Sequence, residues 1–158
     1  MELDQKNCRI LNLLQKNCRM SLTEISKNVG LSVDSVKKRI NKMIEKNIFF
    51  PRIQLRPRNF GFKNIVEIKI KLENQDIKKV NEFIEYLKNT SEIVEILTVS
   101  GNWDISIVII CKDALDLGRI TDKIRRDHGK IISNWTKSLT TCAHKFEEYD
   151  MLKLIKTK

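Results

Sequence analysis

A cluster of helix-capping signals in the first part of the chain constrains its fold more than any other feature of the sequence. Ser21 and Glu24 have the spacing of a capping box, in which each side chain satisfies the other residue's free backbone amide at a helix start. Gly30 ends that short helix, because glycine adopts the left-handed conformation at no steric cost. Ser32 then caps another helix, so the sequence predicts a helix, a tight glycine turn and a helix.

Apolar residues at helical spacing lie on both sides of this turn. Asp4 is the predicted N-cap of a first helix that extends to about Asn17, and the third helix extends to about Lys46. Ser26 suits the second helix because a small side chain lets a neighbour approach closely. The side chains expected to face the core are Asn7 or Cys8, Ile10, Leu11, Leu13, Leu14, Ile25, Val29, Val33, Val36, Ile40, Met43 and Ile44.

The polar face of the third helix, together with the local charge, predicts contact with double-stranded DNA. Residues 1–62 hold 13 basic and 5 acidic residues, a net charge of +8, whereas residues 63–158 hold 17 basic and 15 acidic residues. A solvated lysine-rich surface explains the charge alone equally well, but the capped three-helix spacing favours a recognition helix in the major groove. The predicted DNA-binding residues are Asp34, Ser35 and Lys38 at base edges, Arg39, Lys42 and the helix start at Thr23 on phosphates, and also Ser32 and Lys37.

Residues 48–62 form the predicted connector. Both prolines of the chain, Pro51 and Pro57, lie there, which favours an extended linking strand and a turn over a helix. Arg52, Arg56 and Arg58 either contact phosphates or keep an edge strand soluble, and the pattern fits both roles.

Strand and helix patterns follow one another in the rest of the chain. Residues 66–73 alternate apolar and charged side chains, as in a strand with one buried face. Helical spacing follows Asp76 and again Asp113, and the other predicted strands are residues 93–99, 105–111 and a long last strand, 131–146.

This βαββαβ order predicts a ferredoxin-like sandwich and therefore an α+β protein. The predicted domains are a helix-turn-helix domain at 1–47, the connector at 48–62 and a ferredoxin-like domain at 63–158. If the second face of the sheet is apolar, self-association is the simplest way to cover it.

The first segment resembles the helix-turn-helix of the Lrp/AsnC, or feast/famine, transcriptional regulators. The ungapped matches are Leu3, Asp4, Ile10, Leu11, Gln15, Arg19, Ser21, Glu24, Ile25, Val29, Gly30, Leu31, Ser32, Val36, Arg39, Ile40 and Ile48. Ser26 for Ala, Met43 for Leu and Asn47 for Gly are mild departures, since Asn is the next best residue for a left-handed cap. The resemblance implies a sequence-specific DNA-binding regulator that forms a homodimer, a tetramer or an octamer. It also implies that the connector, with Phe60 in place of the family's last Leu, pairs with its counterpart in a dimer.

The second segment resembles the effector-binding and oligomerisation domain of the same family, through the Gly-Asn-Trp-Asp joint at residues 101–104. The resemblance implies a small-molecule site between subunits, usually for an amino acid. The residues carried over are Gly101, Asn102 and Asp104 of the joint and Ser138, Thr140 and Thr141 of the last strand. Asp104 would pair with an α-ammonium group, while amides near Gly101 and a threonine hydroxyl would bind a carboxylate. The alternative is a plain hairpin turn in which Trp103 fills the core.

Other classes of protein have little support in the residues. Apolar runs fall far short of the ~20 residues that span a bilayer and the N-terminus is polar, so a cytoplasmic protein without a membrane partner is expected. The four cysteines, Cys8, Cys18, Cys111 and Cys142, form no C-x-x-C pair, which favours reduced thiols. No catalytic motif occurs, so the sequence predicts no enzyme, cofactor or metal. The alternative, a haem-biosynthesis decarboxylase of the same layout, needs basic and histidine residues around a tetrapyrrole, and the chain has only two histidines, His128 and His144.

Overall fold

The structure, a computed structural model, describes residues 2–73 and 76–155, and its internal contacts divide it into two units. The helical unit comprises residues up to Gln54 together with those from His144 onward. The sheet unit comprises Leu55–Ala143. Among the described residues, no helix combines the length and the apolar character that a membrane span requires.

The helical unit contains the three predicted helices, α1 (Gln5–Lys16), α2 (Leu22–Val29) and α3 (Val33–Glu45). Their start signals act as predicted: the Asp4 carboxylate accepts the Asn7 amide at 2.8 Å, and both hydrogen bonds of the Ser21–Glu24 capping box are present. Gly30 ends α2 with φ 65°, and Asn47 follows α3 with φ 54°. Both are the left-handed caps that the sequence predicts.

The core of the helical unit is built from one face of each helix. Its buried apolar members are Leu3, Cys8, Ile10, Leu11, Ile25, Val29, Val36 and Met43, while Leu13, Leu14 and Ile40 pack on it half-buried. Val33 differs from the expected apolar face, since 39% of it is exposed. It is the first residue of α3, and the buried contacts of that helix begin one turn later, at Val36.

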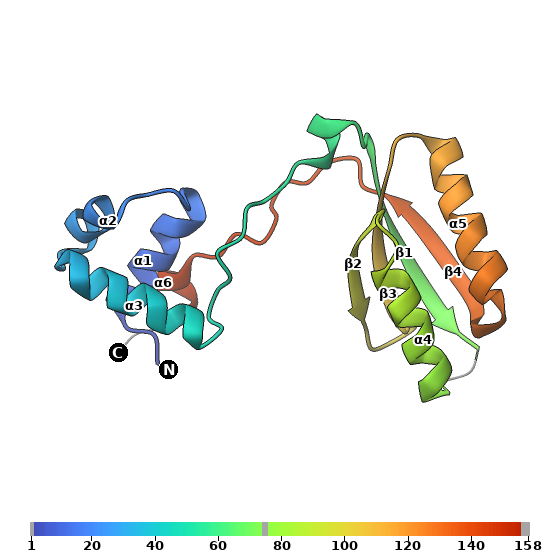
Figure 1. Ribbon diagram of the computed structural model, residues 1–158, viewed down its shortest axis with the longest axis horizontal. Coiled ribbons are helices and arrows are strands. Elements are labelled where there is room, and N and C mark those ends of the chain that lie inside the picture. Colours follow the sequence, from blue (N-terminus) through green and yellow to red (C-terminus); the bar gives the residue numbers. More distant parts are fainter. Residues whose placement is uncertain (1, 74–75, 156–158) are drawn as a thin grey trace. The chain divides into compact units, whose positions relative to one another are not determined.

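The sheet unit has the predicted βαββαβ order. Its elements are β1 (Asn64–Leu72), α4 (Ile77–Lys88), β2 (Ile93–Thr98), β3 (Ile105–Cys111), α5 (Ala114–His128) and β4 (Ile132–Leu139). The strands form one antiparallel sheet in the order β2-β3-β1-β4, with α4 and α5 on one face (Figure 1). This is the ferredoxin-like arrangement, and it confirms the predicted α+β class.

Alternate residues of the strands bury one face of the sheet against the two helices. The members of this core are Val66, Ile68, Ile70, Leu72, Phe83, Leu87, Ile105, Ile107, Ile109, Cys111, Ile120, Ile124 and Ile131. The opposite face is mixed: the Ser106 hydroxyl donates to the Glu67 carboxylate at 2.9 Å, whereas Leu97 on the edge strand β2 is 54% exposed.

The last strand ends at Leu139, which corrects the predicted extension to residue 146. Val66 of β1 pairs with Leu139, and the Thr140 amide still donates to the Ile65 carbonyl at 2.8 Å. Since β1 begins at Asn64, the following residues have no further strand to pair with.

The C-terminal residues also correct the predicted domain that ran from residue 63 to the end. From His144 onward the chain groups with the helical unit, where α6 (Met151–Leu154) packs beside α1 (Figure 1). The physical reason is that Met151 and Ile155 pack against the core of the helical unit and contribute nothing to the core under the sheet.

The connector forms no hydrogen-bonded strand, in contrast to the predicted linking strand. Residues 51–56 have no β partner within the described chain, and a 3₁₀ turn, η1 (Pro57–Phe60), follows them. Gly61 leaves this turn with φ 102°, a conformation that favours glycine.

Candidate nucleic-acid interface and effector site

The exposed face of α3 carries a row of free cations. Lys37, Lys38 and Lys42 are all exposed, and none of them forms an ion pair with any described residue. Asp34 is exposed on the first turn of the same helix. This face is therefore open to phosphates and base edges, as the sequence predicts for a recognition helix.

The start of α3 is fixed by its two serines. The Ser32 hydroxyl oxygen accepts the Ser35 amide at 3.3 Å, and its hydroxyl donates to the Ser35 hydroxyl oxygen at 2.9 Å. Thr23 lies on the first turn of α2 with its side chain exposed. Val33 is exposed beside these groups, and an apolar side chain at such a position suits a thymine methyl group. Helical spacing had placed Val33 in the core, whereas its position on the first turn of α3 leaves it exposed.

Arg39 has internal partners, although the sequence predicts that it contacts a phosphate. Its Nη1 donates to the Asp4 carboxylate at 2.6 Å and to the Asn7 side-chain carbonyl at 2.9 Å. Asn7 is buried, so the guanidinium joins α3 to the interior face of α1. Burial opposes ionisation of Asp4, but hydrogen bonds from the Asn7 amide and from Arg39 hold its pKa below the ordinary value.

The joint between β2 and β3 is held in place by Asp104. Its carboxylate accepts the Leu72 amide at 2.8 Å and the Lys71 ammonium at 3.0 Å. The Leu72 amide first, and Lys71 in addition, lower the pKa of Asp104 against the opposing effect of burial. Asp104 is therefore an ionised tie between the joint and the end of β1. The sequence assigned this carboxylate to a ligand ammonium, and the structure gives it two internal partners.

Beside this tie lies a pocket of about 370 Å³, lined by Leu72, Ile77, Val80, Asn81, Thr98, Val99, Asp104 and Ile105. Gly101 and Asn102 are exposed on the joint and do not line the pocket. Gly101 has φ 121°, so the joint requires glycine there. Trp103 is half-buried and is not part of the core under the sheet, so it does not fill that core as the plain-turn alternative requires.

The candidates on the last strand lie at the other end of β1. Ser138 is opposite Glu67 in the sheet, and Arg58 donates hydrogen bonds to the backbone carbonyls of Thr140 and Thr141. The Asp104 amide, by contrast, donates to the Ile70 carbonyl. Ile65 and Ile70 are separated by five residues of strand, or about 16 Å at ~3.3 Å per residue. Within one chain, the structure does not bring the two groups of candidates together.

The described residues contain no cluster of three or more side chains suited to a metal ion. All four cysteines are free thiols: Cys8 and Cys111 are buried, and Cys18 and Cys142 are exposed. His128 packs against the aromatic rings of Phe83 and Tyr86, with ring centroids 5.2 and 4.3 Å away.

Two family models together match most of the chain. Residues 3–44 match the AsnC-type helix-turn-helix domain, and residues 65–132 match the Lrp/AsnC ligand binding domain. An HTH-type transcriptional regulator of Methanocaldococcus jannaschii is 32% identical over 124 residues, which cover 77% of this chain and 82% of that protein. The HTH-type transcriptional regulator LrpA of Pyrococcus horikoshii is 31% identical over 130 residues, or 82% of this chain and 88% of that protein.

Solved structures share the fold. AsnC of E. coli superposes with a TM-score of 0.83 at 20% identity, covering 95% of this chain and 99% of its own. A regulator of Neisseria meningitidis, solved as a complex with L-Met, has a TM-score of 0.86 at 17% identity and covers 97% of this chain and 99% of its own. None of these similarities supports a haem-biosynthesis decarboxylase. The chain belongs to the Lrp/AsnC family of helix-turn-helix transcriptional regulators.

Proposed function

We propose that this transcriptional regulator reads double-stranded DNA through α3, with Asp34, Ser35 and Lys38 at base edges. Lys37, Lys42 and Thr23 bind phosphates, and Ser32 holds the start of the recognition helix. The observation that carries the proposal is that Lys37, Lys38 and Lys42 are exposed on one helix with no ion pair among the described residues. Lysines without protein partners are available to neutralise DNA phosphates, which releases the counterions condensed on the DNA.

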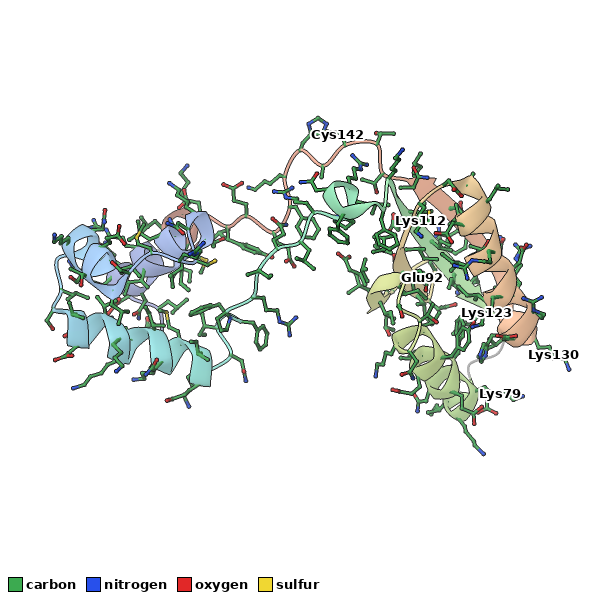
Figure 2. The ribbon with its side chains drawn as sticks, turned by 45° about the horizontal axis from the view of Figure 1, so that its top comes forward. Lys79, Glu92, Lys112, Lys123, Lys130 and Cys142 are labelled. Atoms are coloured by element: carbon green, nitrogen blue, oxygen red, sulfur yellow. The ribbon has the colours of Figure 1, made fainter. Side chains whose placement is uncertain are left out.

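The test begins with selection of binding sites from a random duplex library, because it needs no knowledge of the target. Affinity for the selected site is then measured at several salt concentrations. Lys42→Ala is expected to weaken binding and to reduce the salt slope by about one, whereas Lys38→Ala also relaxes the sequence preference. Lys123→Ala and Lys130→Ala change exposed lysines of the sheet unit and serve as matched controls (Figure 2). Equal losses in all four variants would contradict the assignment to α3.

We propose further that the chain acts as a homodimer or a larger even assembly, including a tetramer or an octamer. Ile53 and Leu55 of the connector are 76% and 64% exposed, and their segment has no β partner within the described chain, which favours pairing with a second copy. The selected DNA should then contain inverted half-sites about 10–10.5 base pairs apart, or a multiple of that spacing. A monomer in sedimentation at micromolar concentration, bound to a single half-site, would contradict this proposal.

The effector is proposed to be an amino acid. The match of residues 65–132 to a ligand binding domain supports this proposal, as does a structural neighbour solved with L-Met. Because Gly101 and Asn102 lie at the opposite end of β1 from Ser138, Thr140 and Thr141, the proposed site joins these groups across two subunits. Asp104 then holds the joint in place through Lys71 and Leu72 and does not itself pair with the ammonium group.

The effector proposal is tested by thermal-shift measurements of the full chain with each common amino acid at millimolar concentration. A hit should raise the melting temperature and alter either the assembly state or the affinity for the selected DNA. Thr141→Val is expected to abolish the shift, while Thr121→Val, a buried change on α5, should leave it in place. No shift with any amino acid would leave an effector-free regulator.

A further inference from the structure

Residues 149–151 are bound to α1 of the helical unit by a specific set of hydrogen bonds. Gln15 accepts the Tyr149 amide at 2.9 Å and donates to the Tyr149 carbonyl at 3.0 Å. Asn12 accepts the Met151 amide at 2.9 Å and donates to the Asp150 carboxylate at 3.1 Å. Each side-chain amide therefore both donates a hydrogen bond to residues 149–151 and accepts one from them. These paired hydrogen bonds specify the register of the segment on α1.

Apolar contacts supplement these hydrogen bonds. Met151 and Ile155 pack against the core that contains Leu11 of α1 and Val36 and Met43 of α3, whereas Leu154 is 63% exposed. Apart from α6, the helical unit is built on the short helices α1, α2 and α3, which bury little apolar surface by themselves. Each added apolar contact is therefore a sizeable part of the unit's stability.

The other end of α1 holds the recognition helix. Asp4, the N-cap of α1, and Asn7 both accept hydrogen bonds from Arg39 of α3. Contacts that keep α1 in place therefore also keep Arg39, and with it α3, in place.

We propose that residues 149–155, the C-terminal clasp, position the recognition helix by fixing α1. The clasp touches no DNA in this proposal and acts through α1 and Arg39. The inference rests on the proposed function of α3 in DNA binding, but docking of the clasp is measured separately from that function.

The thiol of Cys8 reports on docking without any DNA. Cys8 lies on α1 with no exposed surface, and burial, followed by the nearby Asp4 charge, raises the pKa of its thiol. In a full-length background with Cys18→Ser and Cys142→Ser, only Cys8 and Cys111 remain, and both are buried. Cys142 is removed because it lies exposed on the segment after β4 (Figure 2).

In this background Met151→Ala should raise the rate of Cys8 modification by N-ethylmaleimide about tenfold, because local opening of α1 becomes easier. The rate at Cys111, in the sheet unit, should not change. Leu154→Ala removes an exposed side chain of similar size and should leave both rates unchanged. Peptide mass spectrometry separates the two thiols. Should Met151→Ala fail to fold, Asn12→Ala, which removes only polar contacts, provides the same comparison.

DNA affinity is then measured on the selected site, at a temperature where circular dichroism shows the variants to be folded. Met151→Ala and Asn12→Ala should weaken binding roughly three- to tenfold, a loss of about 1 kcal/mol, and Met151→Leu, which keeps the volume, should restore it. The salt slope should stay unchanged, since no phosphate contact is lost.

The outcomes are distinct. Unchanged Cys8 modification would overturn docking of the clasp in solution, and faster modification with unchanged affinity would overturn its positioning role. If the parent chain binds no DNA, the proposed function fails, and the modification rates still decide whether the clasp docks.

Discussion

The Arg39 guanidinium of α3 lies 2.6 Å from the carboxylate of Asp4, the residue that caps α1. One carboxylate thus performs two tasks, since it also accepts the Asn7 amide at the start of α1. Both α3 and α1 depend on this single charged group. Arg39 of α3 therefore has a structural role that its position in the sequence does not reveal.

Arg39→Ala is expected to weaken DNA binding, because α3 loses its anchor on α1. A positioning role leaves the salt slope of binding unchanged, whereas loss of a phosphate contact lowers it by about one. Fluorescence anisotropy on the selected site over a range of salt concentrations separates the two, with Lys42→Ala as the phosphate-contact reference. A reduced slope for Arg39→Ala would restore the phosphate role that the sequence predicts.

Asp4→Asn tests the charge and leaves the cap, because Asn is as good an N-cap as Asp. The pKa of Asp4 is lowered in the folded chain, so its contribution to stability is present above the unfolded pKa of about 4 and is lost as pH falls through the folded value. The parent should be more stable than the variant near neutral pH, by less than about 1 kcal/mol since half of the Asp4 side chain is exposed. This difference should vanish on acidification below the folded pKa. Denaturation followed by circular dichroism at each pH measures it, and a difference independent of pH would count against the ion pair.

Ser21→Ala should lower the free energy of unfolding of the helical unit by about 1 kcal/mol, because α2 loses its N-cap. Glu24→Gln keeps the capping-box pattern and should cost clearly less. Urea denaturation of both variants gives the comparison. Equal losses would mean that the Glu24 charge, and not the box geometry, stabilises the helix start.

Gly101→Ala should strain the joint between β2 and β3, because its φ of 121° is one that side chains rarely adopt. The expected result is a lower melting temperature and loss of any amino-acid response. Gly118→Ala is the matched control, since a Cβ there meets no atom within 4 Å and the residue lies inside α5, where alanine favours the helix by ~0.5–1 kcal/mol. An unaltered amino-acid response in Gly101→Ala would remove the joint from the effector site.

Much of the fold could be predicted because its signals are local. The caps at Asp4, Ser21, Ser32 and Asp113 each accept a hydrogen bond from a backbone amide three residues later. The start of each of these four helices therefore depends on a few neighbouring residues. The strand β3 was predicted to the residue, since turn residues bound an apolar run that Ser106 alone interrupts. The cationic face of α3 was predictable for the same reason, because helical periodicity alone decides which side chains share a face.

The candidate site was only partly predictable. Lys38 and Lys42 lie on the exposed face as expected, but nothing near Arg39 in the sequence signals a partner 35 residues earlier. The same holds for Asp104 on the joint, whose partners Lys71 and Leu72 lie in β1. Arg39 and Asp104 were therefore predicted to contact ligands, because the sequence does not reveal the internal groups that bind them.

The order of the elements, the residues at which most of them begin, the uneven charge and the family could all be predicted from the residues alone, because each depends on neighbouring positions or on direct matches. The end of β4, the partners of Arg39 and the packing of residues 149–155 became clear only in the folded chain. β4 ends because β1 has no further residues to pair with, and the C-terminal clasp docks because Asn12 and Gln15 meet a segment more than 130 residues away. Contacts over such separations leave no period and no local motif, since they depend on which elements lie side by side within each folded unit.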